Sequence, residues 1–163
     1  QEYKLDYIFL RPGYFMQNLT TTLIHDIKTK RQIILPSGKA KFNWIDIENI
    51  GEVSSVLLNR FSEYTNQAIE LTGNENLDFY KVVDLINASI KTPIRFTSVS
   101  PFEFYRIKKK EGMVSGLIIV MILLHFLPRF QKEPALSDYY EKLTGKKPTS
   151  IIDFIEREKI KFQ

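Results

Sequence analysis

The chain has 163 residues, of which 44% are hydrophobic and 26% charged, a balance typical of one ordinary globular domain or one large lobe of a domain. A net charge of only +4 argues against a nucleic-acid partner, and the absence of cysteine excludes disulfides, thiolate metal sites and a cysteine nucleophile. We expect a cytoplasmic protein, and we interpret the basic runs at 106–110 and 159–161 as solvated helix faces.

The most apolar stretch, Val114–Leu127, is shorter than the roughly 18 to 20 residues that a membrane span needs. We therefore expect a helix that is buried in the core, and no membrane partner. The alternative is an interfacial helix, or a hydrophobic contact with a partner or a second copy.

The first element in chain order is an apolar run, Tyr7–Leu10, which predicts a strand buried on both faces. Proline and glycine in Arg11–Gly13 predict a turn, and Tyr14–Lys28 is long enough for a helix. A central strand usually has neighbours on both sides. We therefore expect this chain to be the C-terminal part of something longer.

The following elements alternate between strand and helix and then become mostly helical, which predicts an α/β fold. Strands are expected at Gln32–Leu35, Lys41–Ile45, Gln67–Leu71 and Ile94–Ser98. Helices are expected at Ile47–Phe61, Phe79–Ile90, Ser100–Gly112 and Ile151–Lys159, with a short one after Ser137. The predicted N-caps are Asp46, Asp78, Ser100 and Ser150, and the predicted C-terminal glycine is Gly145.

The candidate site lies where the first strand ends, because open α/β sheets bind ligands at the carboxyl ends of their strands. A flat, partly aromatic wall with one amide suits a planar ring that carries a polar group, such as a nicotinamide or a quinone. The residues of this wall are Pro12, Gly13, Tyr14, Phe15, Met16 and Asn18. An alternative is that the large side chains only pack the helix onto the sheet. Trp44 and Asp46 are likewise explained by the core and by a helix cap.

Other chemistry is not indicated. We interpret His25 and His125 as structural, because neither has metal-ligand residues at a suitable spacing. The sequence contains no nucleophile elbow, no P-loop and no glycine-rich dinucleotide fingerprint. The sequence therefore indicates no particular catalytic residue, and no metal is expected.

The segment Leu10–Leu19 resembles the LRPGxFMxN segment of the NmrA-like atypical short-chain dehydrogenases. The resemblance continues in the family's order through residues 44–52, 68–73, 99–106 and 143–155. It implies the C-terminal part of a Rossmann-type doubly wound sheet over residues 1–72. A smaller, mostly helical lobe on the substrate side is implied over residues 73–163.

The resemblance also implies NAD(P) as cofactor. It makes Pro12, Gly13, Tyr14 and Phe15 the expected cofactor contacts. The expected substrate cleft consists of Met16, Asn18, Trp44, Phe102, Phe104 and Tyr105. The family's N-terminal half, with its glycine-rich phosphate loop, is not in this sequence, and neither is the Tyr-x-x-x-Lys pair of ordinary short-chain dehydrogenases.

The function implied by this resemblance is an NAD(P)-binding oxidoreductase that reduces a quinone or carbonyl compound. One alternative is an NAD(P)-sensing regulator of the NmrA type without turnover, and another is an inactive truncated fragment. The expected ligands are a dinucleotide and a small planar substrate. An unpaired edge at Tyr7–Leu10 would favour a homo-oligomer or a complementing N-terminal half.

Overall fold

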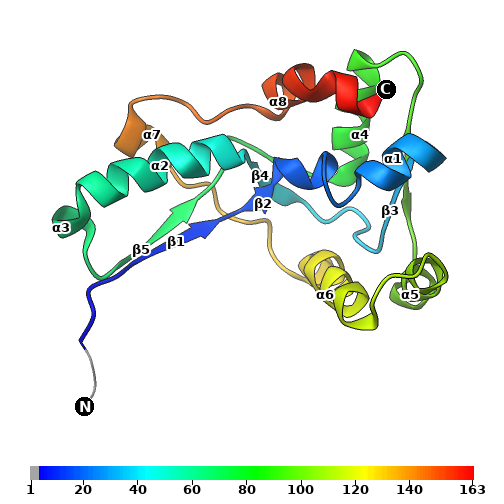
Figure 1. The fold of residues 1–163 in the computed structure, drawn as a ribbon, viewed down its shortest axis with the longest axis horizontal. Coiled ribbons are helices and arrows are strands. Elements are labelled where there is room, and N and C mark those ends of the chain that lie inside the picture. Colours follow the sequence, from blue (N-terminus) through cyan, green and yellow to red (C-terminus); the bar gives the residue numbers. More distant parts are fainter. Residues whose placement is uncertain (1–3) are drawn as a thin grey trace.

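The computed structural model describes residues 4–163, so the first three residues of the expected 1–72 unit lie outside the described part (Figure 1). The strands are β1 Ile8–Pro12, β2 Tyr14–Phe15, β3 Gln32–Leu35, β4 Phe42–Ile45, β5 Gln67–Leu71, β6 Asn76–Leu77 and β7 Arg95–Ser98. The helices are α1 Ile24–Lys30, α2 Ile47–Asn59, α3 Phe61–Tyr64, α4 Phe79–Ser89, α5 Pro101–Lys110, α6 Ser115–Phe126, α7 Tyr139–Thr144 and α8 Ile151–Glu158. Short 3₁₀ turns lie at Met16–Leu19, Leu127–Phe130 and Lys159–Phe162.

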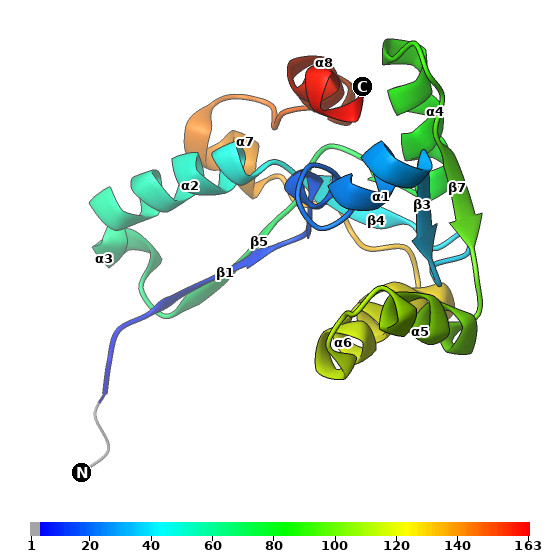
Figure 2. The same cartoon turned by 45° about the vertical axis from the view of Figure 1, so that its right-hand side comes forward.

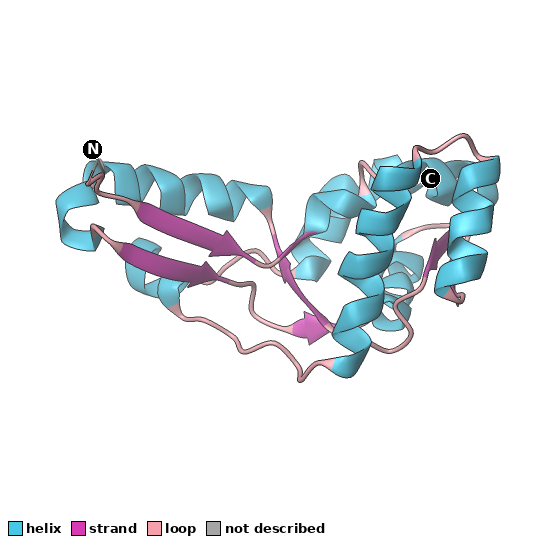
Figure 3. Cartoon of the chain, turned by 90° about the horizontal axis from the view of Figure 1, so that it is seen from below, coloured by secondary structure: helices cyan, strands magenta, loops and turns pink. Residues whose placement is uncertain are grey.

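The strands pair mostly in parallel, as expected of an α/β protein. β1 pairs with β5, β2 with β4, and β3 with β7, all in parallel, and β6 joins β4 in the antiparallel direction. Figure 3 shows α2 lying along the β1–β5 pair. Figure 2 shows α5 and α6 side by side, away from that pair. The predicted fold class, a mixed α/β fold with Rossmann-like parallel strands, is confirmed.

The helix ends follow local chemistry. Each predicted N-cap side chain accepts a hydrogen bond from a backbone N–H two or three residues further on, which satisfies one of the free donors of the first turn. These four predicted caps, Asp46, Asp78, Ser100 and Ser150, are confirmed. Gly145 ends α7 with φ +71°, in the left-handed region that favours glycine.

The expectation that the first strand is buried on both faces is wrong. On one face of the strand, Ile8 and Leu10 pack against the smaller core cluster, which includes Ile69 and residues of α2. On the opposite face of the strand, Phe9 is 54% exposed. The expected turn at Arg11–Gly13 is also wrong. β1 continues through Pro12, and the N–H of Gly13 donates to the carbonyl of Leu71 at 2.9 Å, so the chain passes directly into β2.

The single helix expected over Tyr14–Lys28 is two separate pieces, Met16–Leu19 and α1. The interruption is a run of three threonines at 20–22. The hydroxyls of Thr20 and Thr21 donate to the carbonyl of Gln17 at 3.2 and 2.8 Å. Such side-chain bonds compete with the helical ladder, and β-branching adds to the cost of a helix at these positions.

The expectation that the apolar helix is buried is also wrong. α6 buries only Ile118, Met121 and His125 against the core, while Leu117, Val120 and Leu124 are about half exposed or more. The helix packs on α5 and, through His125, on Tyr14, while Leu117, Val120 and Leu124 lie on its exposed side. The alternative, an interfacial helix or partner surface, stays a prediction.

Buried apolar side chains form two clusters. The larger cluster includes Met16, Trp44, Phe79 and Phe104, and the smaller one joins β1 and β5 to α2 and α7. Both clusters draw residues from either side of position 72. The division of the chain at that residue stays a prediction.

Candidate functional site

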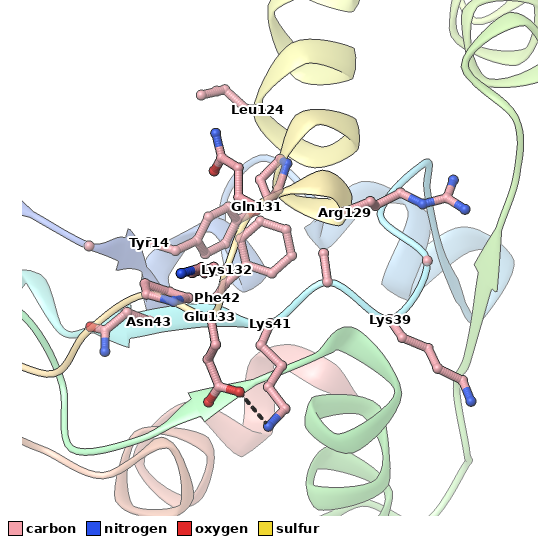
Figure 4. A pocket seen from close by; sticks show the side chains of 15 residues that line it. Tyr14, Lys39, Lys41, Phe42, Asn43, Leu124, Arg129, Gln131, Lys132 and Glu133 are labelled. Atoms are coloured by element: carbon pink, nitrogen blue, oxygen red, sulfur yellow. Dashed lines mark hydrogen bonds and ion pairs between the residues drawn. The ribbon is translucent and has the colours of Figure 1, made fainter.

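A cavity of about 940 Å³ opens next to the carboxyl end of β1, at the start of β2. Its apolar wall includes Tyr14, Phe42 of β4, Leu124 of α6, and two prolines, Pro128 and Pro134. We call it the Tyr14 cavity (Figure 4). A volume of this size is in the range of pockets that hold small organic ligands.

The backbone at the floor of the cavity is closely packed. A Cβ atom on Gly13 would lie 2.6 Å from the carbonyl oxygen of Asn43, so only glycine lets the chain between β1 and β2 pass this close to β4. The amide of Asn43 donates to Asn76, and its oxygen accepts from the backbone N–H of Gly73 at 2.8 Å. The floor is thus fixed by strand contacts before any ligand binds.

Tyr14 is the centre of an aromatic cluster. Its ring centroid lies 4.8 Å from that of Trp44, 5.2 Å from Phe42, 5.9 Å from Phe79 and 5.6 Å from His125. These edge-on and tilted contacts are favourable arrangements for aromatic rings, and they hold Tyr14 in one orientation.

The Tyr14 hydroxyl bonds to His125, and the partners of the imidazole fix the direction of that bond. Nδ1 of His125 lies 2.7 Å from the carbonyl oxygen of Met121, which can only accept, so Nδ1 carries the proton. The other nitrogen, Nε2, therefore accepts from the Tyr14 hydroxyl at 3.0 Å. Burial raises the pKa of Tyr14 and lowers that of His125. Both groups are therefore neutral near pH 7.

Replacing His125 should remove a pH dependence of stability. Because burial lowers the folded-state pKa below the unfolded value of about 6.5, the unfolded chain binds more protons between these two values. Stability therefore rises with pH in that window and flattens above it. We expect His125→Gln to lose a slope of up to about 1.4 kcal/mol per pH unit, as measured by urea unfolding from pH 5 to 7.5.

His25→Gln is the matched control, because His25 lies on the exposed side of α1. It should keep the wild-type slope. An unchanged slope in His125→Gln would contradict the assignment of a buried, neutral imidazole.

The predicted site residues do not all lie together. Gly13 and Tyr14 line the Tyr14 cavity, and Pro12 and Gly13 line a neighbouring cavity of about 640 Å³. Phe15 is exposed on β2, and Asn18 is half-buried in the first 3₁₀ turn. Met16 and Trp44 are buried behind the wall.

The three aromatic residues of α5 that are expected in the substrate cleft do not line either of these cavities. Phe102 is 72% exposed, and Phe104 is fully buried in the larger core cluster. The hydroxyl of Tyr105 donates to Ser115 at the start of α6 at 3.1 Å. Their role in the substrate cleft stays a prediction.

Several cavity residues were not predicted: Phe42, Asn43, Leu124, Arg129 and Lys132. His125 was interpreted as structural, and its contact with Tyr14 was missed. A signal for it is present in the sequence, since His125 is the one imidazole in an otherwise apolar helix and lies four residues after Met121. That spacing places it on the same helix face as a residue of the core.

Two further features bear on the kind of site. Among residues 4–163, no group of three histidine, aspartate or glutamate side chains could hold a metal ion. In the same residues, no helix combines the length and the apolar character needed to cross a membrane.

A family model and several known proteins are similar to this chain over nearly its whole length. The model of the NmrA-like family matches residues 2–152. An NAD(P)H azoreductase of Xenophilus azovorans is 27% identical over 154 residues, which cover 94% of this chain and 53% of the relative. Prestalk A differentiation protein A of Dictyostelium discoideum is 26% identical over 92% of this chain and 50% of the relative. The chain thus spans about half the length of the curated relatives that it matches.

Among solved structures, the fold is similar to that of the NADPH-dependent quinone oxidoreductase QOR2 of Escherichia coli in complex with NADPH. The TM-score is 0.83 at 14% identity, over 94% of this chain and 53% of that one. The negative transcriptional regulator NmrA in complex with NAD has a TM-score of 0.62 at 14% identity, over 95% of this chain and 53% of that one.

Proposed function

Because the chain belongs to the NmrA-like family, we propose that it is part of an NAD(P)-dependent oxidoreductase that reduces a small planar acceptor, a quinone or a related carbonyl compound. The observation that carries this proposal is the Tyr14 cavity, which has an aromatic wall and directly follows the carboxyl end of a parallel strand. The azoreductase relative supports the same reaction class.

The cavity suits the nicotinamide end of the cofactor and an acceptor ring. Its wall of Tyr14, Phe42 and Leu124 offers apolar surface to planar rings, and the backbone around Gly13 approaches the cavity closely. When bound, the cofactor supplies the hydride. The residues of this chain orient the rings and limit access of water to them. The sequence has no glycine-rich loop for the cofactor's phosphates, so we propose that these are held outside the present 163 residues.

Tyr14 lines the cavity and bonds to the buried His125 behind it, and neither group of this pair is charged near pH 7. The tyrosine keeps its proton and shares it with Nε2 of His125, so the tyrosine oxygen can accept a hydrogen bond from a ligand. We propose that the pair orients the bound rings.

The test is oxidation of NADH and NADPH by a panel of quinones and azo compounds, using the gene product that contains this chain. Two neighbouring leucines of α6 provide a matched pair of variants. Leu124 lines the cavity and Leu123 does not, although both are about half exposed. We expect Leu124→Trp to narrow the cavity and lower kcat/KM about tenfold, an energy of about 1.4 kcal/mol, while Leu123→Trp stays within about twofold of wild type.

No oxidation with any acceptor would contradict the proposed enzyme. If NAD(P) binds tightly under the same conditions, that result would instead support the second candidate, an NAD(P)-sensing regulator without turnover. The raised pKa of Tyr14 favours this second candidate to some degree, because it makes the tyrosine a weak acid.

A further inference from the structure

The Tyr14 cavity carries a net positive charge. Its charged lining residues are four cations and one carboxylate: Lys39, Lys41, Arg129, Lys132 and Glu133. Lys41 Nζ lies 2.9 Å from Glu133, and this hydrogen bond, with another from Asn76, holds the pKa of Glu133 below its usual range. The one carboxylate is therefore ionised and already neutralised by a lysine.

The other three cations have no ion-pair partner within residues 4–163. The guanidinium of Arg129 packs over the ring of Phe126, 5.2 Å from its centroid, and against Gly38. In Figure 4 Lys132 is drawn beside the Tyr14 and Phe42 rings, whereas the side chains of Lys39 and Arg129 extend away from these rings. An apolar ring wall is thus bordered by cations that are free to meet an anion.

We propose that the acceptor reduced in this cavity is a planar aromatic compound with an anionic substituent, such as a sulfonate or a carboxylate. The ring body lies on the wall formed by Tyr14, Phe42 and Leu124, and the anionic group meets Lys132, with Arg129 adding positive charge to the same cavity. Charge-assisted hydrogen bonds to such a group are stronger than those to a neutral substituent, so the cavity prefers the anion. This inference rests on the proposed function and adds the class of its substrate.

The position of the cations favours the acceptor over the phosphates of the cofactor as their ligand. They come from the loop that precedes β4 and from the segment that follows α6, and neither segment has the glycine-rich sequence that surrounds a pyrophosphate. Arg129 and Lys132 line the cavity, whereas the buried residues Trp44 and Phe79 do not.

A pair of matched ligands tests the proposal by binding alone. Anthraquinone-2-sulfonate and anthraquinone-2-sulfonamide have the same ring system and nearly the same shape, but only the first is charged. Trp44 is the one tryptophan of the chain, and its ring lies 4.8 Å from that of Tyr14, so quenching of its fluorescence reports occupation of the cavity. We expect the sulfonate to bind about tenfold more tightly at low salt, and the difference to shrink in 0.5 M NaCl.

Two double variants separate the effect of these cations on binding from the effect of the overall charge. In Arg129→Gln/Lys132→Gln the preference for the sulfonate should fall to about twofold or less, with the sulfonamide affinity unchanged. Lys28→Gln/Lys147→Gln removes the same amount of charge at exposed positions that do not line the cavity, and should keep the preference. All four replaced side chains are exposed, so folding is not at risk.

Equal affinities of the two ligands for the wild-type chain would overturn the proposal, and so would an equal loss of preference in both double variants. Displacement of the sulfonate by NADP⁺ would assign the cations to the cofactor, and would overturn it as well. No cofactor is oxidised in these titrations. Their failure would therefore leave the proposed oxidoreductase standing, and flat oxidation traces would leave the binding preference standing.

Discussion

Gly73→Ala is expected to destabilise the protein by more than about 3 kcal/mol, and in practice to prevent folding at 37 °C. A Cβ atom at this position would lie 1.8 Å from the carbonyl oxygen of Trp44 and 3.0 Å from its carbonyl carbon. Both are backbone atoms of a central strand, so no side chain can move aside to make room. The expected result is measured as loss of the cooperative urea transition followed by Trp44 fluorescence.

The matched control is Gly51→Ala in the exposed part of α2, where an added Cβ atom would meet nothing within 4 Å. This substitution should stabilise the protein by about 0.5–1 kcal/mol, because alanine loses less backbone entropy than glycine in a helix. A Gly73→Ala protein that unfolds at the wild-type urea concentration would show that β4 does not approach residue 73 as described.

The close approach of Gly73 to β4 also explains why the candidate site is rigid. The N–H of Gly73 donates to Oδ1 of Asn43, and Asn43 lines the Tyr14 cavity. On the other side, Gly13 makes the same kind of close approach to the carbonyl of Asn43. Two glycines thus bring two other backbone segments against β4. The cavity depends on these two close approaches. Replacing either glycine should therefore lower the stability of the fold and distort the cavity.

The features that the sequence predicts correctly are those decided by neighbours in the chain. Asp46 and Ser100 cap their helices because the accepting oxygen and the free N–H are only two or three residues apart. The strand at Gln67–Leu71 was found from its residue types and the turn that follows it. These features depend only on residues that are close together in the sequence.

The features that were missed depend on distant partners. The composition of α6 indicates burial, yet its exposure depends on which elements cover it, and Leu117, Val120 and Leu124 are about half exposed or more. Likewise Gly13 was assigned to a turn, although its role is a close approach to Asn43, 30 residues away. The contacts around Tyr14 show the same dependence. Tyr14 was found from the strand that precedes it, but His125 is brought to it from 111 residues away.

The second large effect concerns a buried ion-pair cluster that joins α1 to α5. Lys108, which we had expected on a solvated face, is almost fully buried and is hydrogen-bonded to the carboxylate of Asp26. Lys30 lies 2.8 Å from Asp26 and 2.5 Å from Glu111, and Lys108 lies 2.9 Å from Glu111. Burial would raise the pKa of Asp26, but its hydrogen bonds to Lys108 and Lys30 outweigh this and hold the pKa below its usual range.

We expect Lys108→Met to cost about 3–5 kcal/mol, because it leaves the buried Asp26 carboxylate without its main partner. Asp26→Leu should also destabilise the protein, but by less, because the buried Lys108 ammonium keeps Glu111 as a partner at 2.9 Å. The double variant should cost clearly less than the sum of the two, because neither charge then remains. Arg11→Met is the matched control. Its ion pair with Glu70 is about 60% exposed on both sides, and its loss should cost no more than about 0.5 kcal/mol.

The loss of stability at acid pH tests whether the charges of Asp26 and Lys108 cause these effects. A carboxylate whose folded pKa is lowered contributes stability that is complete above its unfolded pKa of about 4. That stability is lost as the pH falls through the folded pKa. Urea unfolding of the wild type at pH 7, 5, 4 and 3 should therefore show a loss that begins near pH 4, and the double variant of Asp26 and Lys108 should show a shallower one. Additive single and double effects, with the same acid response in both proteins, would mean that the α1–α5 contact is held by its apolar packing and not by these charges.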